Sequence, residues 1–590
     1  MPSRADAALQ PAPIEQADDA PIAIGITGHR LGRIAGYDLA ALARRIDETL
    51  ATLEKVSGGA RFRLVGSLAE GADTIVAEVA LDRGWQVDAV LPFERAEYAR
   101  DFVEPKATDR LAGLIVRAKN VFELPGSRHE AGGEAAAYER AGRVMLSQSE
   151  LLIAVWDGGP PQGRGGAAQM VVEAIGLGMP IVSIHPDAER APELMWSGLN
   201  DHQLGPEALD TVARSGLDQV SRLFADDGPL RRFDASVAAE RKRSRTPRIL
   251  GIAYPLLLAA TGVRPLRWSD FRAPRPAALA VPLGHQPAFK DRVHERLIPQ
   301  FEQADLEAGD AGQLFRGAFV SNFSLAALAV TLSLLGLVIP KYLKPLLVFG
   351  EFTAIATILL ITQIGGRVGW HRQWLERRQL AERLRCLAIS AELGNLSLVD
   401  LGRNSGRASS AALFVARGLQ LPSASVTPAY LGAARDHLLA LLDDQISYLR
   451  REATRMHHLE HRLHRVGGVL FAMTAVICAI VLAGDLIRPL LFAHAAPHIT
   501  HPVMITVISA ALPAIGAAIY GMRMQGDFAG VAERNTDLAA QLVGVRLIAL
   551  DEAPDFDGLR RLVRRTTELL TEDVSQWLRA SLARPLSLPG

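Results

Sequence analysis

The stretch FVSNFSLAALAVTLSLLGLVI at residues 319–339 is followed by PKYLKP at 340–345 and by LLVFGEFTAIATILLITQIGG at 346–366. The first run carries no charge, and the second carries only Glu351. At a rise of ~1.5 Å per residue the first run makes a helix of ~31 Å, close to the thickness of a bilayer's hydrocarbon core. The stretch therefore predicts a transmembrane helical hairpin. Buried helices of soluble proteins usually contain shorter apolar runs.

A second pair of apolar runs of membrane length lies at residues 466–483 and 503–520. The order of hairpin, long helices, hairpin and long helices is a loose internal repeat, and it predicts four transmembrane helices. Positive residues crowd the segment 367–465 between the hairpins. By the positive-inside rule, we expect this segment and both termini to lie in the cytoplasm.

The composition excludes several classes of function. Lys+Arg and Asp+Glu both number 64, so no basic excess points to a nucleic-acid partner. Cys386 and Cys478 are the only cysteines, and Cys478 lies inside an apolar run. A structural disulfide and a cysteine-ligated metal are therefore not expected. Residues 1–20 lack an apolar core and predict a disordered lead, not a signal peptide.

Short apolar runs alternate with helical patterns between residues 21 and 190. We expect strands at 22–26, 62–65, 86–90, 121–124, 151–155 and 181–184, and helices at 38–56, 72–83, 134–149 and from 167 onward. This alternation predicts a Rossmann-like α/β domain with a doubly wound, mainly parallel sheet. Ligands of such sheets bind outside the carboxyl ends of the strands.

Three of the predicted strand ends are rich in glycine, at residues 27–30, 66–73 and 158–166. Glycine lets a backbone approach a phosphate closely, and the free N–H groups of a following helix favour an anion. One such loop is explained by turn geometry alone, but three on one rim favour a nucleotide-like ligand. None of the loops is a Walker A motif or a full Gly-x-Gly-x-x-Gly motif.

The motifs Ile-Thr-Gly-His-Arg at 26–30, Gly-Ser-Leu-Ala-Glu-Gly-Ala-Asp at 66–73, and Ala-Val-Trp-Asp-Gly followed by Gly-Arg-Gly-Gly at 163–166 resemble those of the SLOG superfamily. This Rossmann-like group contains DprA and the Lonely Guy phosphoribohydrolases. The resemblance covers about residues 21–190 and implies a nucleotide or nucleotide-derived ligand. The candidate ligand-binding residues are Thr27, Gly28, His29, Arg30, Gly66, Ser67, Glu70, Gly71, Asp73, Asp157, Gly163, Gly165 and Gly166.

The resemblance also implies roles for these positions. The residues matching the phosphate or ribose side are Gly28, Gly66, Ser67, Gly165 and Gly166. Glu70 and Asp73 would meet hydroxyls or the base. For His29, a ligand hydrogen bond or a helix-start contact is favoured over a role as acid or base.

Some SLOG members split a nucleotide from its base with the motif Pro-Gly-Gly-x-Gly-Thr-x-x-Glu. Here Gly166-Ala167 stands where that motif has Gly-Thr, and Met170 stands where it has the glutamate. Glu173 comes three residues late and is expected to be a solvated helix residue. A binding domain without catalytic residues therefore fits the sequence better than a glycosidase.

The membrane half resembles the SLATT group. Its hairpin is followed by a helix rich in Trp, Arg and Ala-Glu at 370–385, with Trp577 near the C-terminus. SLATT proteins are two-helix membrane effectors, often joined to SLOG or nucleotide-signalling modules in bacterial defence. The resemblance covers about residues 310–585 and implies a nucleotide-gated effector that can assemble into a pore. Glu351 and Asp485 are candidate polar positions in its path, although Glu351 is also near enough to a helix end to be interfacial.

Two further features remain open. The apolar run 249–263 contains Pro255 and is too short to span, so it is either a buried or an interfacial segment. Two histidine sets share the spacing i, i+4, i+7, namely His457, His461 and His464, and His494, His498 and His501. No Cys, Asp or Glu completes a ligand set for either, so we expect no metal.

The chain thus divides into seven predicted parts: a disordered lead (1–20), a Rossmann-like nucleotide-binding domain (21–190), a connector and helical stalk (191–318), hairpin one (319–366), cytoplasmic helices (367–465), hairpin two (466–521) and C-terminal cytoplasmic helices (522–590). The combined hypothesis is a multi-pass protein located in the inner membrane. It senses a nucleotide-like small molecule, and ligand binding controls its transmembrane helices as the effector. Its expected partners are the lipid bilayer and further copies of the chain, without nucleic acid, metal or resident cofactor. The alternative is a membrane-anchored nucleotide hydrolase of the phosphoribohydrolase type.

Overall fold

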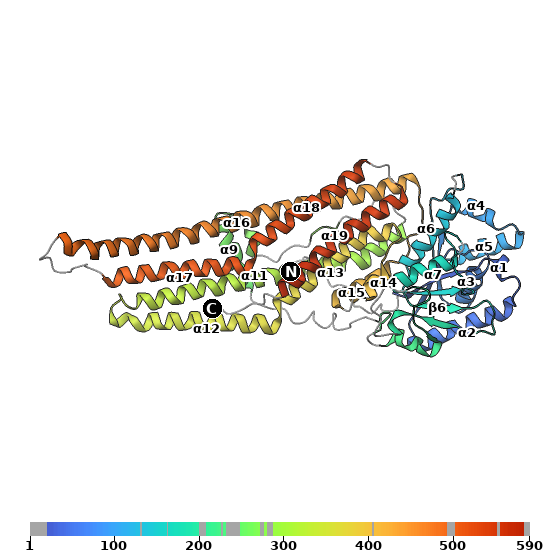
Figure 1. Cartoon of the computed structure of the whole chain (residues 1–590), viewed down its shortest axis with the longest axis horizontal. Coiled ribbons are helices and arrows are strands. Elements are labelled where there is room, and N and C mark those ends of the chain that lie inside the picture. Colours follow the sequence, from blue (N-terminus) through green and yellow to red (C-terminus); the bar gives the residue numbers. More distant parts are fainter. Residues whose placement is uncertain are drawn as a thin grey trace, which may run out of the picture.

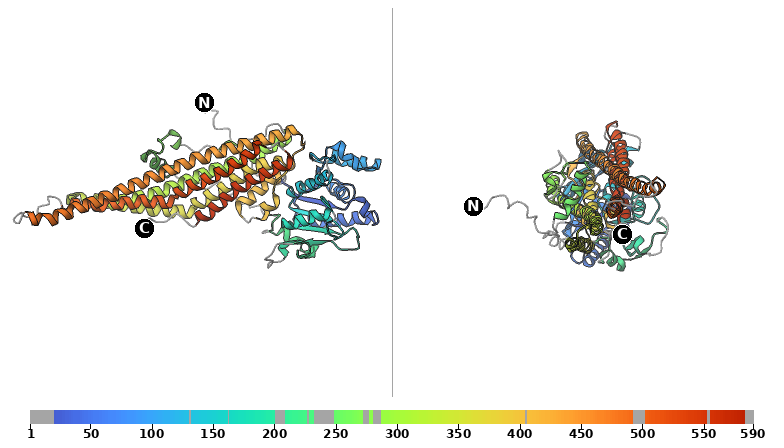
Figure 2. Two further views of the ribbon diagram at one scale, coloured as in Figure 1. Left: turned by 45° about the horizontal axis from the view of Figure 1, so that its top comes forward. Right: turned by 90° about the vertical axis from the view of Figure 1, so that its left-hand side faces the viewer.

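The computed structural model describes residues 20–129, 132–161, 163–199, 208–225, 228–231, 248–271, 277–279, 287–403, 406–491, 502–551 and 555–582. The molecule is elongated, with an α/β domain at one end and a bundle of long helices that extends away from it (Figure 1). The further views show that the bundle helices run along the long axis of the molecule (Figure 2). The length of these helices separates the sheet from the far end of the bundle.

Nine strands of the described residues form one sheet in the order β8-β7-β6-β5-β1-β2-β3-β4-β9. The strands are β1 Ile22–Gly28, β2 Phe62–Gly66, β3 Gln86–Leu91, β4 Asn120–Glu123, β5 Leu151–Val155, β6 Ile181–Ile184, β7 Glu193–Met195, β8 Arg214–Gly216 and β9 Ala424–Ser425. All pairs from β6 to β9 across the sheet are parallel, whereas β7 and β8 run antiparallel at the other edge. Strand order reverses between β1 and β5, which is the doubly wound topology. The predicted fold class is confirmed.

Helices cover both faces of this sheet. They are α1 Leu31–Ile34, α2 Leu39–Ser57, α3 Ala72–Asp82, α4 Arg95–Tyr98, α5 Pro105–Arg117, α6 Gly133–Ser147 and α7 Ala167–Gly176. Helices α2, α3 and α5 share one hydrophobic core with one face of the sheet, and α6 and α7 share another core with the opposite face. In α2 the Asp38 carboxylate caps the helix by accepting from the N–H groups of Ala40 and Ala41, and Gly58 ends it in a left-handed conformation.

The sheet recruits strands from outside the predicted domain. Strands β7 and β8 lie beyond the boundary that we placed at residue 190. Strand β9 comes from the helical half, and its Ala424 pairs with Phe122 of β4 in parallel register. Two residues carry no periodicity, so only the folded chain reveals this strand.

The helical half begins near residue 248. Its helices are η6 Arg248–Ile252, α9 Ala253–Ala260, η7 Trp268–Phe271, α10 Pro287–Arg292, η8 Val293–Leu297, α11 Ile298–Leu335, η9 Lys341–Leu343, α12 Lys344–Val368, α13 Trp370–Glu392, α14 Leu398–Arg403, α15 Arg407–Leu419, α16 Pro428–Leu491, α17 Pro502–Gly526, α18 Phe528–Asp551 and α19 Phe556–Leu582. Among the described residues, four helical stretches are long and apolar enough to cross a membrane: Pro287–Leu335, Lys341–Val368, Pro428–Ala483 and Val503–Asp551. Each contains most or all of one predicted apolar run.

In each hairpin, the first (incoming) helix continues directly from the preceding helical segment, whereas the second (outgoing) helix is separated from the helix that follows it by a single non-helical residue. We call the part of the bundle between the sheet and the apolar runs the stalk. Helix α11 and the 64-residue helix α16 run without interruption from the stalk into their apolar segments. The outgoing helices α12 and α17 are each separated from the next helix by one left-handed residue, Gly369 (φ 71°) and Asp527 (φ 47°). Such single-residue junctions let a helix change direction, because the left-handed backbone breaks the run of helical hydrogen bonds.

The first hairpin is held together inside its apolar region by a polar contact. The side-chain amide of Asn322 on α11 donates to the hydroxyl of Thr362 on α12 at 3.0 Å. On α12, Glu351 is half-buried and shares a helix face with the buried residues Ala354 and Ile358. The structure therefore turns Glu351 toward the helix pair.

The amino ends of the strands are docked on the helical half through buried charges. Glu150, just before β5, accepts two hydrogen bonds from Arg417 of α15, at 2.8 and 2.6 Å, and both side chains are buried. Arg417 also donates to the carbonyl of Leu230. The N–H of Ala23 in β1 completes the set by donating to Glu150 at 3.4 Å.

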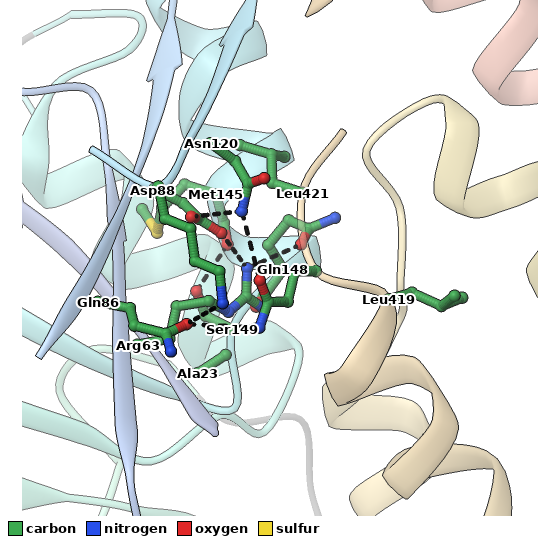
Figure 3. A network of polar contacts seen from close by, with 12 residues as sticks. Ala23, Arg63, Gln86, Asp88, Asn120, Met145, Gln148, Ser149, Leu419 and Leu421 are labelled. Carbon is green, nitrogen blue, oxygen red and sulfur yellow. Dashed lines mark hydrogen bonds and ion pairs between the residues drawn. The ribbon is translucent and has the colours of Figure 1, made fainter. Parts of the chain in front are cut away.

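A second buried network lies beside this pair (Figure 3). The fully buried Arg63 of β2 donates to Asp88 of β3 at 2.7 Å and to the Gln148 carbonyl at 3.2 Å. The Asn120 amide donates to Asp88 at 2.8 Å and reaches Gln420, after α15, at 3.4 Å. The charges of Arg63 and Asp88 on neighbouring strands thus neutralise each other, and the amide of Asn120 on β4 completes the network at the surface that meets the helical half.

We expect Arg417→Ala to destabilise the protein by about 3–5 kcal/mol, because it leaves the Glu150 carboxylate buried and unpaired. The measurement is the denaturation midpoint of the full-length protein in detergent. The double variant Glu150→Gln with Arg417→Met removes both charges and should recover part of the loss. Arg117→Ala, which breaks an exposed ion pair with Asp82, is the matched control and should change stability by less than about 0.5 kcal/mol. Equal effects of the two arginine variants would contradict the assignment.

Candidate functional site

The carboxyl ends of β1 and β5 lie side by side where the strand order reverses. The Gly28 register partner is Val155, and the N–H of His29 donates to the Val155 carbonyl at 3.0 Å. The point where the strand order reverses is where open α/β sheets bind their ligands. Three of the predicted site residues, Gly28, His29 and Asp157, therefore lie at the switch point of the sheet.

His29 and Asp157 form a side-chain pair across the switch point. The Nε2 atom of His29 lies 3.0 Å from Oδ1 of Asp157 and 3.2 Å from its backbone N. The imidazole donates to the carboxylate when Nε2 is protonated and accepts from the backbone N–H when it is not. This favours the predicted contact role for His29, since its ring nitrogen is already held by the neighbouring loop.

Asp157 is held ionised. Burial raises the pKa of its carboxyl, but hydrogen bonds from the Gly159 N–H, from His29 and from Arg33 outweigh that effect and hold the pKa at about 2. Arg33 of α1 donates to the carboxylate from Nε at 3.1 Å and from Nη2 at 2.7 Å. The Asp157 carboxylate therefore ties α1 to the loop after β5.

Asp73 is the opposite case. It lies buried in the first turn of α3, where burial raises its pKa to about 7 against the effects of a hydrogen bond from the Ala69 backbone and of the Arg30 charge. Its neighbour Tyr98 donates to the Ser67 carbonyl at 2.9 Å. A carboxyl whose pKa lies near neutrality at the carboxyl ends of the strands is a typical feature of functional sites.

Tyr138 of α6 is a site residue that the sequence analysis missed. The Arg30 guanidinium lies 4.5 Å from its ring centre, and the Phe93 ring meets it edge-on at 5.8 Å. A Cβ at Gly165 would collide with the Cβ and backbone of Tyr138, so the third glycine loop packs against the base of this side chain. The Tyr138 hydroxyl oxygen is buried and has no hydrogen-bond partner among the described residues. A ligand that donates to or accepts from this hydroxyl would remove the cost of leaving it unpaired.

The predicted glycines are explained largely by contacts between the loops. A Cβ at Gly28 would collide with Ala72, and one at Gly66 would collide with Ile26. Gly71 has φ 124° and lies against the backbone of residues 29–31, with Arg30 and Gly71 forming a β-bridge. These glycines let the ends of β1 and β2 and the two loops after them pack closely at the rim, which is a structural requirement independent of any ligand.

The remaining predicted residues lie around this cluster. Thr27 is buried in β1, Glu70 accepts the Leu31 N–H through its carbonyl, and Gly166 begins α7. Space around the Cα of Gly163 is open, so no described side chain ties that residue to the rim.

Glu173, weighed as a displaced catalytic glutamate, is held elsewhere. Its carboxylate accepts from Arg143 of α6 at 3.0 Å and from the Gln169 amide at 2.9 Å. Glu173 lies on α7 as predicted, but it is less solvated than expected, because its side chain is only 25% exposed and is ion-paired with Arg143. Arg164 and Glu139 form a neighbouring ion pair at 2.6 Å.

A cavity of about 510 Å³ lies in the stalk, away from the sheet. Its wall includes Phe315 and Arg316, whose guanidinium lies 5.3 Å from the Tyr254 ring centre and 5.1 Å from that of Trp374. The junction residue Asp527 also lines it. The space therefore adjoins one of the points where an outgoing helix changes direction.

No metal centre is formed by the described residues, because no three His, Cys, Asp or Glu side chains meet in a suitable group. His457, His461 and His464 lie on the exposed side of α16. His494, His498 and His501 lie outside the described residues. Comparison with protein-family models and with curated proteins finds no match for this chain.

We expect the stability of the protein to depend on pH through Asp73. The native carboxyl, with a pKa of about 7, holds its proton at pH values where the unfolded chain, with a pKa near 3.8, has lost it. Unfolding is therefore favoured as the pH rises from about 4 to about 7. Asp73→Asn should remove this dependence and gain up to about 4 kcal/mol relative to wild type across that window.

The measurement is the melting temperature of the full-length protein and of Asp73→Asn between pH 4.5 and 8. Asp82→Asn, at the exposed end of the same helix, is the control and should shift the wild-type curve by a constant amount. A difference between wild type and Asp73→Asn that does not change with pH would show that the carboxyl is not protonated in the native state.

Proposed function

We propose that this protein is a membrane-bound sensor whose α/β domain binds a nucleotide-derived ligand and controls the packing of its membrane helices. The observation that carries the proposal is the cluster of Arg30, Asp73 and Tyr138 at the switch point of the sheet. It combines an exposed cation, a buried carboxyl and an unpaired hydroxyl. Phosphate, ribose hydroxyls and a base offer the matching groups.

Arg30 is suited to bind a phosphate. It is exposed and forms no ion pair among the described residues, in contrast to Arg33, which is bound to Asp157. Its guanidinium carbon lies over the Tyr138 ring, 4.5 Å from the ring centre, and a cation held in this way can still donate its N–H groups to an oxyanion. The position next to the start of α3 adds the favourable end of a helix dipole.

Two features support control of the membrane helices by this domain. The core on the α6 and α7 face continues without a break into α13, α16, α18 and α19, so movement at the sheet displaces the stalk. The outgoing helices change direction at Gly369 and Asp527, where a displaced stalk could pivot. For gating, the ligand must bind the active arrangement more tightly than the resting one.

The motif resemblances support the same proposal. The SLOG-like loops meet at the switch point, and the SLATT-like order of hairpins corresponds to the four candidate spans. We infer from them an inner-membrane, homo-oligomeric effector of bacterial defence with both termini in the cytoplasm. The arginine-rich segment between the hairpins, residues 367–465, favours this orientation.

A specific observation keeps the nucleotide hydrolase as the second candidate. The pKa of Asp73 is raised to about 7 by burial, and a general acid or base works best when its pKa lies near the operating pH. Against it stands Glu173, which is engaged by Arg143 and Gln169 away from this carboxyl.

The test is equilibrium dialysis of the full-length protein in detergent against a nucleotide panel, with mass spectrometry of both chambers. We expect an intact nucleotide on the protein side. Tyr138→Phe removes only the unpaired hydroxyl and should weaken binding by about 2- to 13-fold, the equivalent of one net hydrogen bond. Asp47→Asn, which breaks an ion pair with Arg83 on the surface of the domain, is the control and should bind as wild type.

The bound nucleotide is then added to vesicles that contain the protein. We expect ion flux to rise with ligand, and the midpoint of the response to shift in Tyr138→Phe by the same factor as the affinity. Flux that stays constant at saturating ligand would refute the effector role. Free base and sugar phosphate in the dialysis chambers would instead identify the hydrolase.

A further inference from the structure

A short segment, residues 248–271, stands off the side of the bundle (Figure 2). It comprises η6, α9 and η7. Its outer surface is strongly apolar: the side chains of Trp268, Leu256 and Phe271 are 84, 50 and 47% exposed, and Leu266 is exposed as well. Large apolar patches exposed on a protein surface usually mark a contact with a partner or a membrane.

The segment is firmly attached to the bundle. Tyr254 and Leu258 of α9 are buried in a core formed with Phe315, Phe319 and Met456, among others. After the helix, Arg264 and Asp270 form an ion pair at 2.7 Å that closes the loop leading to η7. The exposed apolar side chains are therefore presented by a fixed element.

Contacts with two different helices place this segment at similar distances outside the apolar runs of the bundle. The carboxyl-terminal half of η6 packs on Gly317 of α11, and the Thr261 carbonyl accepts a hydrogen bond from Arg462 of α16 at 2.5 Å. Gly317 precedes the apolar run 319–339 of α11 by two residues, and Arg462 precedes the apolar run 466–483 of α16 by four. At ~1.5 Å per residue, these positions lie ~3 Å and ~6 Å outside the apolar runs.

This depth corresponds to the headgroup region of a bilayer, which adds about 5–8 Å to each side of the hydrocarbon core. Segment η7 packs against η6, so Trp268 and Phe271 are held near the same level. Tryptophan is enriched in this region because its ring is apolar and its N–H can meet water or headgroups. Arg267, exposed beside Trp268, adds a charge that anionic headgroups attract.

We propose that residues 256–271 form an interfacial element that lies in the headgroup region of the bilayer crossed by the four helices, with Leu256, Leu266, Trp268 and Phe271 in contact with lipid. The proposal rests on insertion of those helices in a bilayer. Besides the two hairpins, this element would be a third contact with the membrane, located on the stalk beside the cavity wall at Tyr254 and Arg316. The element would thereby fix the height of the stalk relative to the membrane surface.

The test measures the lipid exposure of position 268 in the full-length protein reconstituted in vesicles containing anionic lipid. Trp268→Cys is made in a Cys478→Ala background and spin-labelled. Burial raises the pKa of Cys386 to about 12, so that thiol stays unlabelled. Collisions of the label with oxygen, which dissolves in lipid, are compared with collisions with a water-soluble nickel chelate.

Two control positions bracket the result. Val103 of the α/β domain is 88% exposed, as open as Trp268 in the fold, and Ile480 of α16 is 66% exposed within an apolar run. We expect the oxygen-to-nickel ratio of Trp268→Cys to exceed that of Val103→Cys severalfold and to approach that of Ile480→Cys. A ratio equal to that of Val103→Cys, with Ile480→Cys in lipid, would overturn this proposal alone.

The other outcomes are also decisive. If Ile480→Cys itself collides freely with the nickel chelate, the helices are not inserted, and the proposed membrane function fails together with this inference. If the label at position 268 is shielded from both reagents, a protein surface covers the patch, and the lipid contact is refuted.

Discussion

The docking of the sheet's amino edge on the end of α15 and on β9 is the interaction on which the rest of the structure depends. Glu150, Arg63 and Asp88 are charged side chains with almost no exposure to solvent. A buried charge is tolerated only with a partner in good geometry, and a single shift of the interface would leave several charges unpaired. The network therefore specifies one orientation of the α/β domain on the stalk.

That orientation decides which end of the sheet is available. All central strands are parallel, so attaching their amino ends to the stalk leaves their carboxyl ends facing away from it. The switch point with His29, Asp157 and Asp73 is thereby separated from the membrane helices by the thickness of the whole domain. Under the proposed function, a ligand bound there would act on the membrane helices only through the protein, by way of the continuous core on the α6 and α7 face.

Near the membrane, the helices pack through large side chains set against small ones. Gly312 lies against Trp374, Gly516 against Phe471, and Gly521 against Phe323. In a bilayer, helices gain little from excluding water, so close contact at small residues matters more than apolar area. The cavity beside Asp527 interrupts this close packing at the junction of α17 and α18, and a second arrangement of the stalk could use that space.

The sequence by itself determined the elements whose signal is local. The length of an apolar run decides whether a helix can cross a membrane, and the strands of the front domain follow from short apolar runs between glycine-rich turns. The sequence also pointed to His29, Asp73 and Asp157, because each follows a predicted strand and the carboxyl ends of parallel strands lie at one edge of the sheet. It also left open whether the run 249–263 is buried or interfacial, and the structure finds one side of α9 buried and the other exposed.

Tertiary structure alone decided what depends on residues far apart in the chain. Strand β9 is two residues long and joins the sheet about 300 residues after β4, so it has no pattern to detect. Arg417 is one of many arginines in the sequence, and only folding shows that it neutralises Glu150. Tyr138 lies on a helix between the motifs, and it joins the candidate site because Arg30, after β1, lies over its ring and Gly165 packs against its Cβ. In each case the physical cause is a contact between distant segments, which one-dimensional periodicity does not encode.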